Sequence, residues 1–82
     1  MINIKKAYQY FNDRFNIEKS THGWYKFINP FDDEAIISRK LKMAVNFNYG
    51  WVKCFRTNYT NSIINFIIDF ESLSSSFKRA II

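Results

Sequence analysis

The stretch NPFDDE at 29–34 brings together three carboxylates, the groups from which a site for a hard divalent cation is built. Asp32, Asp33 and Glu34 supply oxygen ligands of the kind that Mg²⁺ and Ca²⁺ take in proteins. No further acidic residue follows until Asp69, so the nearby sequence does not complete a coordination shell. The favoured interpretation is that one carboxylate caps a turn or a short helix while the others face water.

Cys54 and His22 are the only cysteine and the only histidine of the chain. These counts exclude an intramolecular disulfide and provide too few nitrogen and sulfur donors for a structural zinc site. Positive charges on Lys53 and Arg56 could stabilise a reactive thiolate at Cys54. The favoured interpretation is instead that Cys54 is a small buried residue on a strand. His22 has no neighbouring carboxylate or nucleophile with which to form a triad, so a solvated loop position is expected. We therefore predict a protein that is not an enzyme and has no cofactor.

Basic and aromatic residues in the middle of the chain carry the strongest functional signal. The net charge is +5, and the window from Ala35 to Ile68 contains basic residues but no acidic one. The nine Phe, five Tyr and two Trp are more aromatic side chains than a core of this size can hide. This combination favours nucleic acid as the partner, because bases stack on exposed rings while ammonium groups contact phosphates. The candidate nucleic-acid-binding residues are Trp24, Lys26, Arg39, Lys40, Lys42, Tyr49, Trp51, Lys53 and Arg56.

The elements that must position these residues follow from the spacing of apolar residues. A chain of 82 residues is long enough for one domain only, so 1–82 is predicted to be a single unit. Apolar residues at helical spacing predict an amphipathic N-terminal helix at 1–17. A β-sheet region is expected at 22–56, and a C-terminal helical region at 60–82.

A β-hairpin is the clearest element within the sheet region. Residues 42–48 alternate between apolar and polar types, and 51–55 return as the partner strand after a tight turn at 48–50. A further short strand, rich in aromatic residues, runs from Trp24 to Asn29 and is stopped by Pro30. The sequence therefore predicts a small antiparallel sheet of at least three strands.

The hairpin leaves open which of its faces meets solvent. One face of the returning strand carries Trp51, Lys53 and Phe55, and one face of the preceding strand carries Lys42, Asn46 and Asn48. If these faces coincide and are exposed, rings flanked by ammonium groups suit single-stranded nucleic acid. In the alternative, the rings point into the core beneath a helix and the lysines only solubilise the outside. Alternation groups the residues but does not decide between the two arrangements.

The C-terminal region is predicted to begin with an apolar helix at 62–73, which should be the most buried helix. A short polar side chain at Thr60 or Asn61 is expected to cap it by accepting an unpaired backbone N–H. The serines at 74–76 are expected to interrupt the helix, and 77–82 to end the chain as one or two further helical turns.

Taken together, these elements resemble the zinc-binding domain of bacterial- and phage-type DNA primases. In that family a strand ends in Cys-Pro-Phe-His with an acidic pair, a hairpin returns as Cys-Phe-Gly-Cys, and an apolar helix follows. The matching residues here are Pro30, Phe31, Glu34, Cys54, Phe55, Ile64, Phe66, Leu73, Phe77 and Ala80. The resemblance covers about residues 17–80. It implies a zinc-ribbon fold that contacts a template strand through its sheet.

Three of the four metal-ligand positions of that family carry other residues in this chain. Asn29 and Thr57 stand where the family has cysteine, Asp32 stands where it has histidine, and Cys54 alone remains. One thiolate with a carboxylate, an amide and a hydroxyl does not make a tetrahedral zinc site. The resemblance therefore implies four vestigial ligand positions and no bound metal. An ordinary apolar core must then supply the stability that zinc provides in the family.

The predicted fold is α+β: a small antiparallel sheet, zinc-ribbon-like but metal-free, with an N-terminal helix and C-terminal helices. The predicted function is non-catalytic binding of nucleic acid, with single-stranded DNA favoured, in viral or mobile-element replication or genome handling. The alternative is a protein-interaction module, either a virion component or an inhibitor of a host replication or defence factor, which binds protein through the same aromatic surface.

The expected location is the cytoplasm of the host cell, or the virion. The most apolar stretch, 63–70, is too short to span a membrane and contains Asn65 and Asp69, so no membrane association is expected. The oligomeric state is left open.

Overall fold

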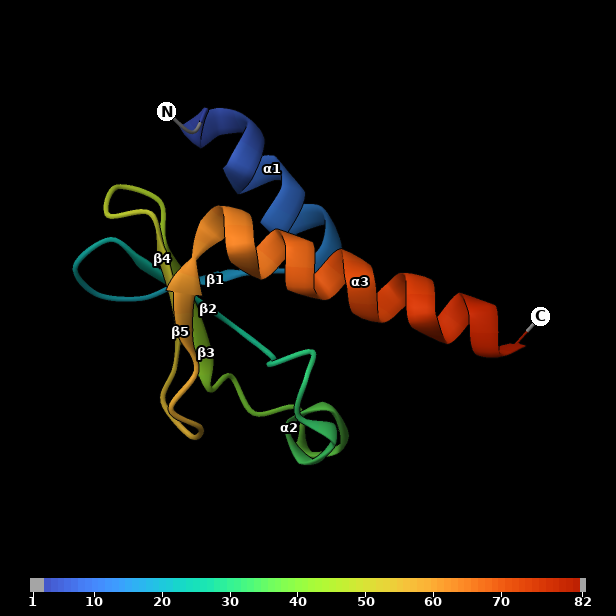
Figure 1. Cartoon of the computed structure of the whole chain (residues 1–82). Coiled ribbons are helices and arrows are strands. Elements are labelled where there is room, and N and C mark those ends of the chain that lie inside the picture. The colour runs from blue at the N-terminus through green and yellow to red at the C-terminus, as the bar shows by residue number, and fades with distance from the viewer. Residues whose placement is uncertain (1–2, 82) are drawn as a thin grey trace.

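The computed structural model describes the backbone of residues 3–81 and the side chains of residues 3–72. The elements in chain order are α1 (Ile4–Phe15), β1 (Glu18–Lys19), β2 (Trp24–Phe27), α2 (Asp33–Ser38), β3 (Met43–Asn46), β4 (Trp51–Cys54), β5 (Thr60–Ser62) and α3 (Ile63–Ile81). The strands form one antiparallel sheet in the order β1-β2-β3-β4-β5. Figure 1 shows α1 and α3 on the same side of this sheet. The predicted α+β class is confirmed; the likeness to a zinc ribbon stays a prediction.

Polar side chains at the helix starts explain where the first two helices begin. The Asn3 side chain accepts a hydrogen bond from the backbone N–H of Lys6 and starts α1. Asp32 accepts from the N–H groups of Glu34 and Ala35 and starts α2. The acidic stretch therefore caps a short helix, which is the favoured interpretation of its three carboxylates.

The entry into α3 differs from the prediction in one respect. Thr60–Ser62 pairs with β4 as a fifth strand, so neither Thr60 nor Asn61 is the cap. The hydroxyl of Ser62 takes this role and accepts a hydrogen bond from the N–H of Asn65. The predicted cap was wrong by one or two residues because a three-residue edge strand carries too little pattern to reveal its pairing.

The predicted interruption of the C-terminal helix at 74–76 is wrong, because α3 continues without a break from Ile63 to Ile81. Serine lowers helix propensity by only a few tenths of a kcal/mol per residue, and no Gly or Pro is present to stop the helix. The side chains of Leu73, Phe77 and Ala80, which contribute to the primase resemblance, lie outside the described residues.

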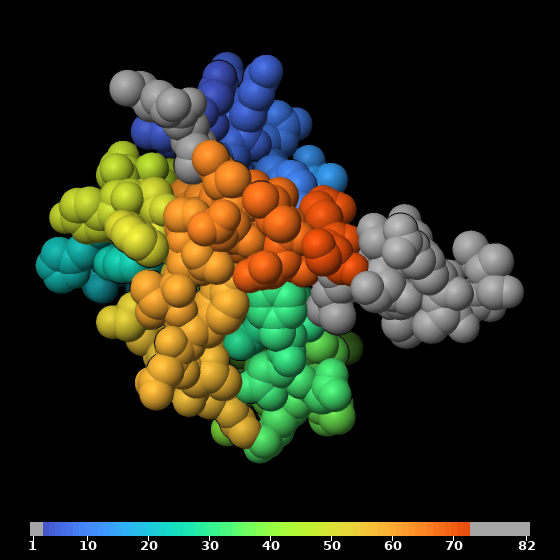
Figure 2. All heavy atoms as spheres, in the orientation of Figure 1, coloured from blue at the N-terminus to red at the C-terminus, as the bar shows by residue number. Residues whose placement is uncertain are grey.

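The core lies between the sheet and the two long helices. The inner face of the sheet contributes Phe27, Met43, Val45, Val52 and Cys54, and all five are buried. The helices contribute Ala7, Phe11, Ile63 and Phe66. Figure 2 shows α3 in contact with α1 on one side and with the segment that contains α2 on the other, so α3 closes the core. This helix was predicted to be the most buried one, with apolar surface around most of its circumference, but Ile63 and Phe66 are buried while Ile64 and Ile68 are each 56% exposed, so it is buried on one face only.

A polar link also ties the two long helices together. The hydroxyl of Tyr10 donates a hydrogen bond to the carboxylate of Glu71, and the guanidinium carbon of Arg14 lies 3.8 Å from the centroid of the Tyr10 ring. Burial, together with the hydrogen bond to Glu71, raises the pKa of Tyr10 to about 12. This link fixes α1 against α3 beside the aromatic core.

Candidate nucleic-acid interface

The register of the sheet brings the aromatic and basic residues of three strands onto one face. Asn46 pairs with Trp51 and Ala44 with Lys53, while the N–H of Phe55 donates to the carbonyl of Lys42 at 2.7 Å. On the other side of β3, Trp24 pairs with Asn46 and Lys26 with Ala44. We call this surface the outer face and define it by Trp24, Lys26, Lys42, Ala44, Asn46, Trp51, Lys53 and Phe55.

The outer face is directed away from α1 and α3. Val52 and Cys54, which alternate with its residues along β4, are buried against the helices. Trp51 is 49% exposed and Phe55 is 56% exposed. The alternative in which these two rings point into the core is therefore wrong. Asn48 does not share the face, because it lies in the turn between β3 and β4.

Two rows of side chains cross the outer face at right angles to the strands. One row places Trp24 and Trp51 on either side of Asn46, and the next places Lys26 and Lys53 on either side of Ala44. The β3 residues Asn46 and Ala44 are fully buried beneath their larger neighbours. Because strands lie about 4.8 Å apart, each flanking pair is separated by roughly 10 Å at the backbone. The surface therefore presents two rings and two cations above a floor of small residues.

Asn46 holds the two turns at the end of this face in place. Its Nδ2 donates to the carbonyl of His22 at 3.2 Å, while its Oδ1 accepts from the N–H groups of Asn48 and Tyr49, each at 3.0 Å. The side chain thus links the β1–β2 turn to the β3–β4 turn. Sequence reasoning placed Asn46 on the strand face but missed this role, because its partners lie in turns that no local pattern connects.

A pocket of about 380 Å³ opens on the outer face between β2 and the segment that enters β3. Its lining residues are Ser20, Thr21, Trp24, Lys26, Leu41, Lys42 and Phe55. The Nζ atom of Lys53 lies 6.0 Å from the centroid of the Phe55 ring, within the range of a cation–π contact. Ser20, Thr21 and Leu41 were missed as site residues, since only the folded chain brings them beside Trp24 and Lys42.

Six of the seven acidic residues lie away from the outer face, and the seventh, Glu18, lies on the same side of the sheet as Lys26. Glu18 of β1, opposite Lys26, is the only acidic residue within the strands of the described chain. The other six acidic residues belong to α1, α3, α2 or its cap. Lys26 has Glu18 as its cross-strand neighbour, and none of the ion pairs among the described residues involves Lys26, Lys42 or Lys53, so these lysines can meet an anionic ligand.

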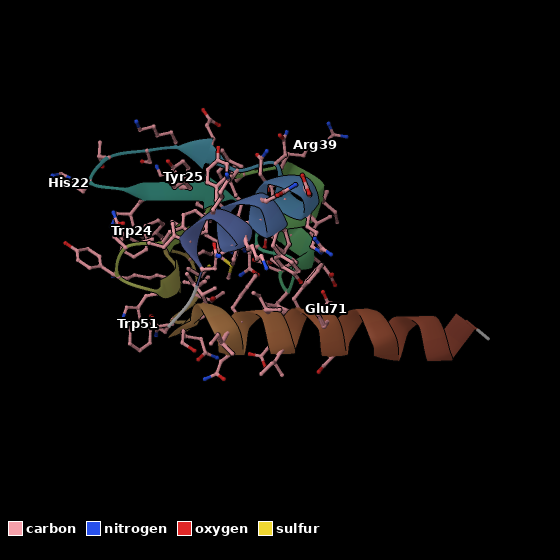
Figure 3. All side chains as sticks on the ribbon, turned by 90° about the horizontal axis from the view of Figure 1, so that it is seen from above. His22, Trp24, Tyr25, Arg39, Trp51 and Glu71 are labelled. Atoms are coloured by element: carbon pink, nitrogen blue, oxygen red, sulfur yellow. The ribbon has the colours of Figure 1, made fainter. Side chains whose placement is uncertain are left out.

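The remaining predicted site residues lie apart from the two rows. Tyr49 is 72% exposed in the turn between β3 and β4, next to the Trp51 end of the outer face. Arg39 ends α2, and Lys40 follows it in the loop before β3. In Figure 3, Arg39 lies well apart from Trp24 and Trp51, which lie close to each other. The structure therefore brings Trp24, Lys26, Lys42, Trp51 and Lys53 together and separates Arg39 from them.

The four positions that the resemblance predicts to be vestigial ligands lie close together at the edge of the core. Nδ2 of Asn29 donates to Sγ of Cys54 at 3.3 Å, and the backbone N–H of Thr57 donates to the same sulfur at 3.5 Å. The N–H of Asp32 donates to the carbonyl of Asn29 at 3.3 Å. Cys54 is buried on the inner face of β4, as its favoured interpretation predicted. Hydrogen bonds thus join the segment that contains Asn29 to the segment that contains Cys54 and Thr57.

The thiol of Cys54 is affected by both burial and these hydrogen bonds. Burial raises its pKa, but the hydrogen bonds from Thr57, Arg56 and Asn29 outweigh burial and leave the pKa below its ordinary value. Within the described residues, no group of three or more His, Cys, Asp or Glu side chains is arranged to hold a metal ion.

Arg56 adds two ion pairs to this group of contacts around Asn29 and Cys54, which we call the Asn29–Cys54 corner. Its Nε lies 3.2 Å from a carboxylate oxygen of Asp32, and its guanidinium also pairs with Glu34. The side chain therefore connects the end of β4 to the first turn of α2. In the sequence, Arg56 lies in a stretch without acidic residues. Its two carboxylate partners lie more than twenty residues earlier, so the sequence alone did not predict these ion pairs.

Replacing Asn29 with alanine is expected to lower the free energy of unfolding by about 1–3 kcal/mol. Asn29 is buried, and its loss leaves the N–H of Phe31 without the acceptor that it now has at 2.8 Å. Urea denaturation followed by circular dichroism measures the change. Asn58→Ala is the matched control, because this exposed loop residue should alter stability by no more than about 0.5 kcal/mol. Equal effects of the two substitutions would mean that the hydrogen bonds of Asn29 do not stabilise the folded chain.

Two further findings concern the chain as a whole. Within residues 3–81, no helix combines the length and the hydrophobicity that a membrane-spanning segment requires. Comparisons with protein-family models, with curated proteins and with solved structures find no match to this chain.

Proposed function

We propose that the chain is a non-catalytic nucleic-acid-binding protein whose favoured ligand is single-stranded DNA. The observation that carries this proposal is the pair of rows on the outer face, with Trp24 and Trp51 in one and Lys26 and Lys53 in the other. Rings on a sheet suit unpaired bases, which expose their flat faces for stacking. In a duplex these faces are already stacked on neighbouring base pairs. The lysines supply the positive charge that phosphates require.

The choice of DNA, and of replication or genome handling in a virus or mobile element, follows from the resemblance to primase zinc-ribbon domains. The meeting of Asn29, Cys54 and Thr57 supports that resemblance, because ligands of one metal must also converge. A binding surface of this kind suits an accessory role in replication or genome handling, in the host cytoplasm or in the virion.

A fluorescence titration with a short oligothymidine tests the proposal. Trp51 is half exposed, so stacking of a base on its ring is expected to quench its emission at low salt. With three lysines on the outer face, raising the salt from about 50 mM to about 200 mM should lower the affinity roughly 20-fold. Absence of quenching at the lower salt concentration would exclude the proposed function.

A second candidate function, binding of a protein partner, is favoured by a different observation. A pocket of about 320 Å³ between α1 and α3 is lined by Ala7, Ile63, Ile64 and Ile67, together with Asn3 and Lys6. Ile64, one of these lining residues, is 56% exposed. An apolar contact here is expected to depend only weakly on salt, and this weak dependence distinguishes it from binding to phosphate. A replication or virion protein is the partner expected in that case.

A further inference from the structure

The two tryptophans of the outer face differ in their surroundings. Trp51 is half exposed and does not line the pocket on this face. Trp24 is less exposed and forms one wall of the pocket. Figure 3 shows the two residues on different strands, with the β1–β2 turn and His22 beyond Trp24. One nucleic-acid strand that crosses the face would therefore meet two unlike aromatic sites.

The residues around Trp24 match the parts of one nucleotide. The rings of Trp24 and Phe55 offer stacking surfaces for a base. The ammonium groups of Lys26 and Lys42 supply two charges for a phosphate. The hydroxyl groups of Ser20 and Thr21 can donate to or accept from the edge of a base. A volume of about 380 Å³ is within the range of sites that enclose small ligands.

We propose that this pocket binds a single nucleotide of the strand, with the base against Trp24 and the phosphate between Lys26 and Lys42. The proposal rests on the proposed function and deepens it, since it assigns an anchoring role to one of the two rings. Trp51 then stacks on a neighbouring base without enclosing it. Because a ring alone stacks on any base, any preference for one base arises in the pocket, where hydroxyl groups meet the base edge.

Single-tryptophan variants test the pocket, because each leaves one ring as the reporter. Trp51→Phe leaves the emission of Trp24, and Trp24→Phe leaves that of Trp51. Each variant is titrated with the four deoxynucleoside 5′-monophosphates, with inorganic phosphate and with oligothymidine. A monophosphate at millimolar concentration is expected to quench Trp24 saturably and to leave Trp51 nearly unchanged. Inorganic phosphate should quench neither, because it brings no base to the ring.

Lys42→Ala and Lys40→Ala form a matched pair, since both remove one positive charge from the same short loop and only Lys42 lines the pocket. In the Trp51→Phe background, Lys42→Ala should weaken monophosphate binding roughly fivefold, and Lys40→Ala should leave it within experimental error. Equal losses of affinity in the two variants would mean that the overall positive charge, and not the pocket, attracts the nucleotide. This result would overturn the proposed nucleotide pocket.

The outcomes separate failure of the pocket from failure of the proposed function. Suppose that oligothymidine quenches the emission but no monophosphate changes the emission of Trp24. This result would overturn the proposed nucleotide pocket and leave the proposed nucleic-acid binding intact. No response to oligothymidine excludes the proposed function, whereas a monophosphate response of Trp24 would still support the pocket. Amide chemical shifts of the unmodified chain check the result without substitutions: a monophosphate should shift Ser20, Thr21 and Lys42. Shifts confined to residues outside the pocket would overturn the assignment.

Discussion

Replacing Phe66 with alanine is expected to lower the free energy of unfolding by about 3–5 kcal/mol. Phe66 is fully buried in α3, and its ring lies at the centre of the aromatic core. Ring centroids within 6.4 Å of it belong to Phe11, Phe15, Phe27, Phe31, Tyr59 and Phe70. These partners come from α1, β2, α3 and the loops, so collapse around the vacated space would require several elements to move together. Most of the cavity is therefore expected to remain.

Urea denaturation followed by circular dichroism measures this loss. Ile68→Ala is the control on the same helix, because Ile68 is 56% exposed and should change stability by no more than about 0.5 kcal/mol. Phe66→Leu keeps most of the apolar volume and should fall between the two. A small domain is stable by only about 5–15 kcal/mol, so Phe66→Ala would remove a large share of the total. A loss no larger than that of Ile68→Ala would contradict the central role of this ring.

The position of Phe66 explains how this chain folds with an ordinary core. The ring centroid of Phe31, directly after Pro30, lies 5.7 Å from that of Phe66. The ring centroid of Tyr59, in the loop after β4, lies 6.3 Å from that of Phe66. The segments around Asn29 and Cys54 are therefore held by rings on the helix side as well as by hydrogen bonds to sulfur. Ring packing and hydrogen bonding together therefore connect these two segments to each other and to α3.

The sequence predicted the hairpin well because each of its strands carries a complete local pattern. The large apolar residues Met43 and Val45 alternate with small or polar neighbours, and Gly50 adopts a positive φ in the turn that joins the strands. The exposed side of the hairpin was not predictable in the same way. Phe11 and Phe66, which lie far from the hairpin in sequence, cover one face and so leave Trp51 on the other. Only the packing of helices on the sheet decides this question.

The short elements were missed for a different reason. Glu18–Lys19 and Thr60–Ser62 become strands because they pair with the edges of a sheet that already exists, and neither has strong β-propensity. The partners of Arg56 were hidden for a similar reason: Asp32 and Glu34 belong to a segment that only folding brings next to the end of β4. Local pattern predicts elements, but contacts between distant segments depend on topology.

Removing both rings and removing both lysines of the outer face are expected to weaken binding to oligothymidine in two distinguishable ways. Trp24→Ala with Trp51→Ala should lower the affinity about 30-fold or more, since each stacked base contributes roughly 1–3 kcal/mol. The fluorescence anisotropy of a dye-labelled oligothymidine measures binding here, because this variant has no tryptophan left. The salt dependence should remain the same, because no phosphate contact is lost. Lys26→Ala with Lys53→Ala should instead reduce the slope of log K against log salt concentration by about 1.4, as expected for two lost contacts to a single strand.

Lys5→Ala with Lys6→Ala is the matched control for the lysine pair. It removes the same charge from the exposed surface of α1, on the helical side of the sheet. If the outer face is the binding surface, this control should leave the slope nearly unchanged, because charges beyond about 10 Å of the strand are largely screened at moderate salt. Equal slopes for the two lysine pairs would move the binding surface off the sheet. A loss of slope in the double tryptophan variant would mean that the rings position the lysines, so stacking and phosphate contact could not be assigned to separate rows.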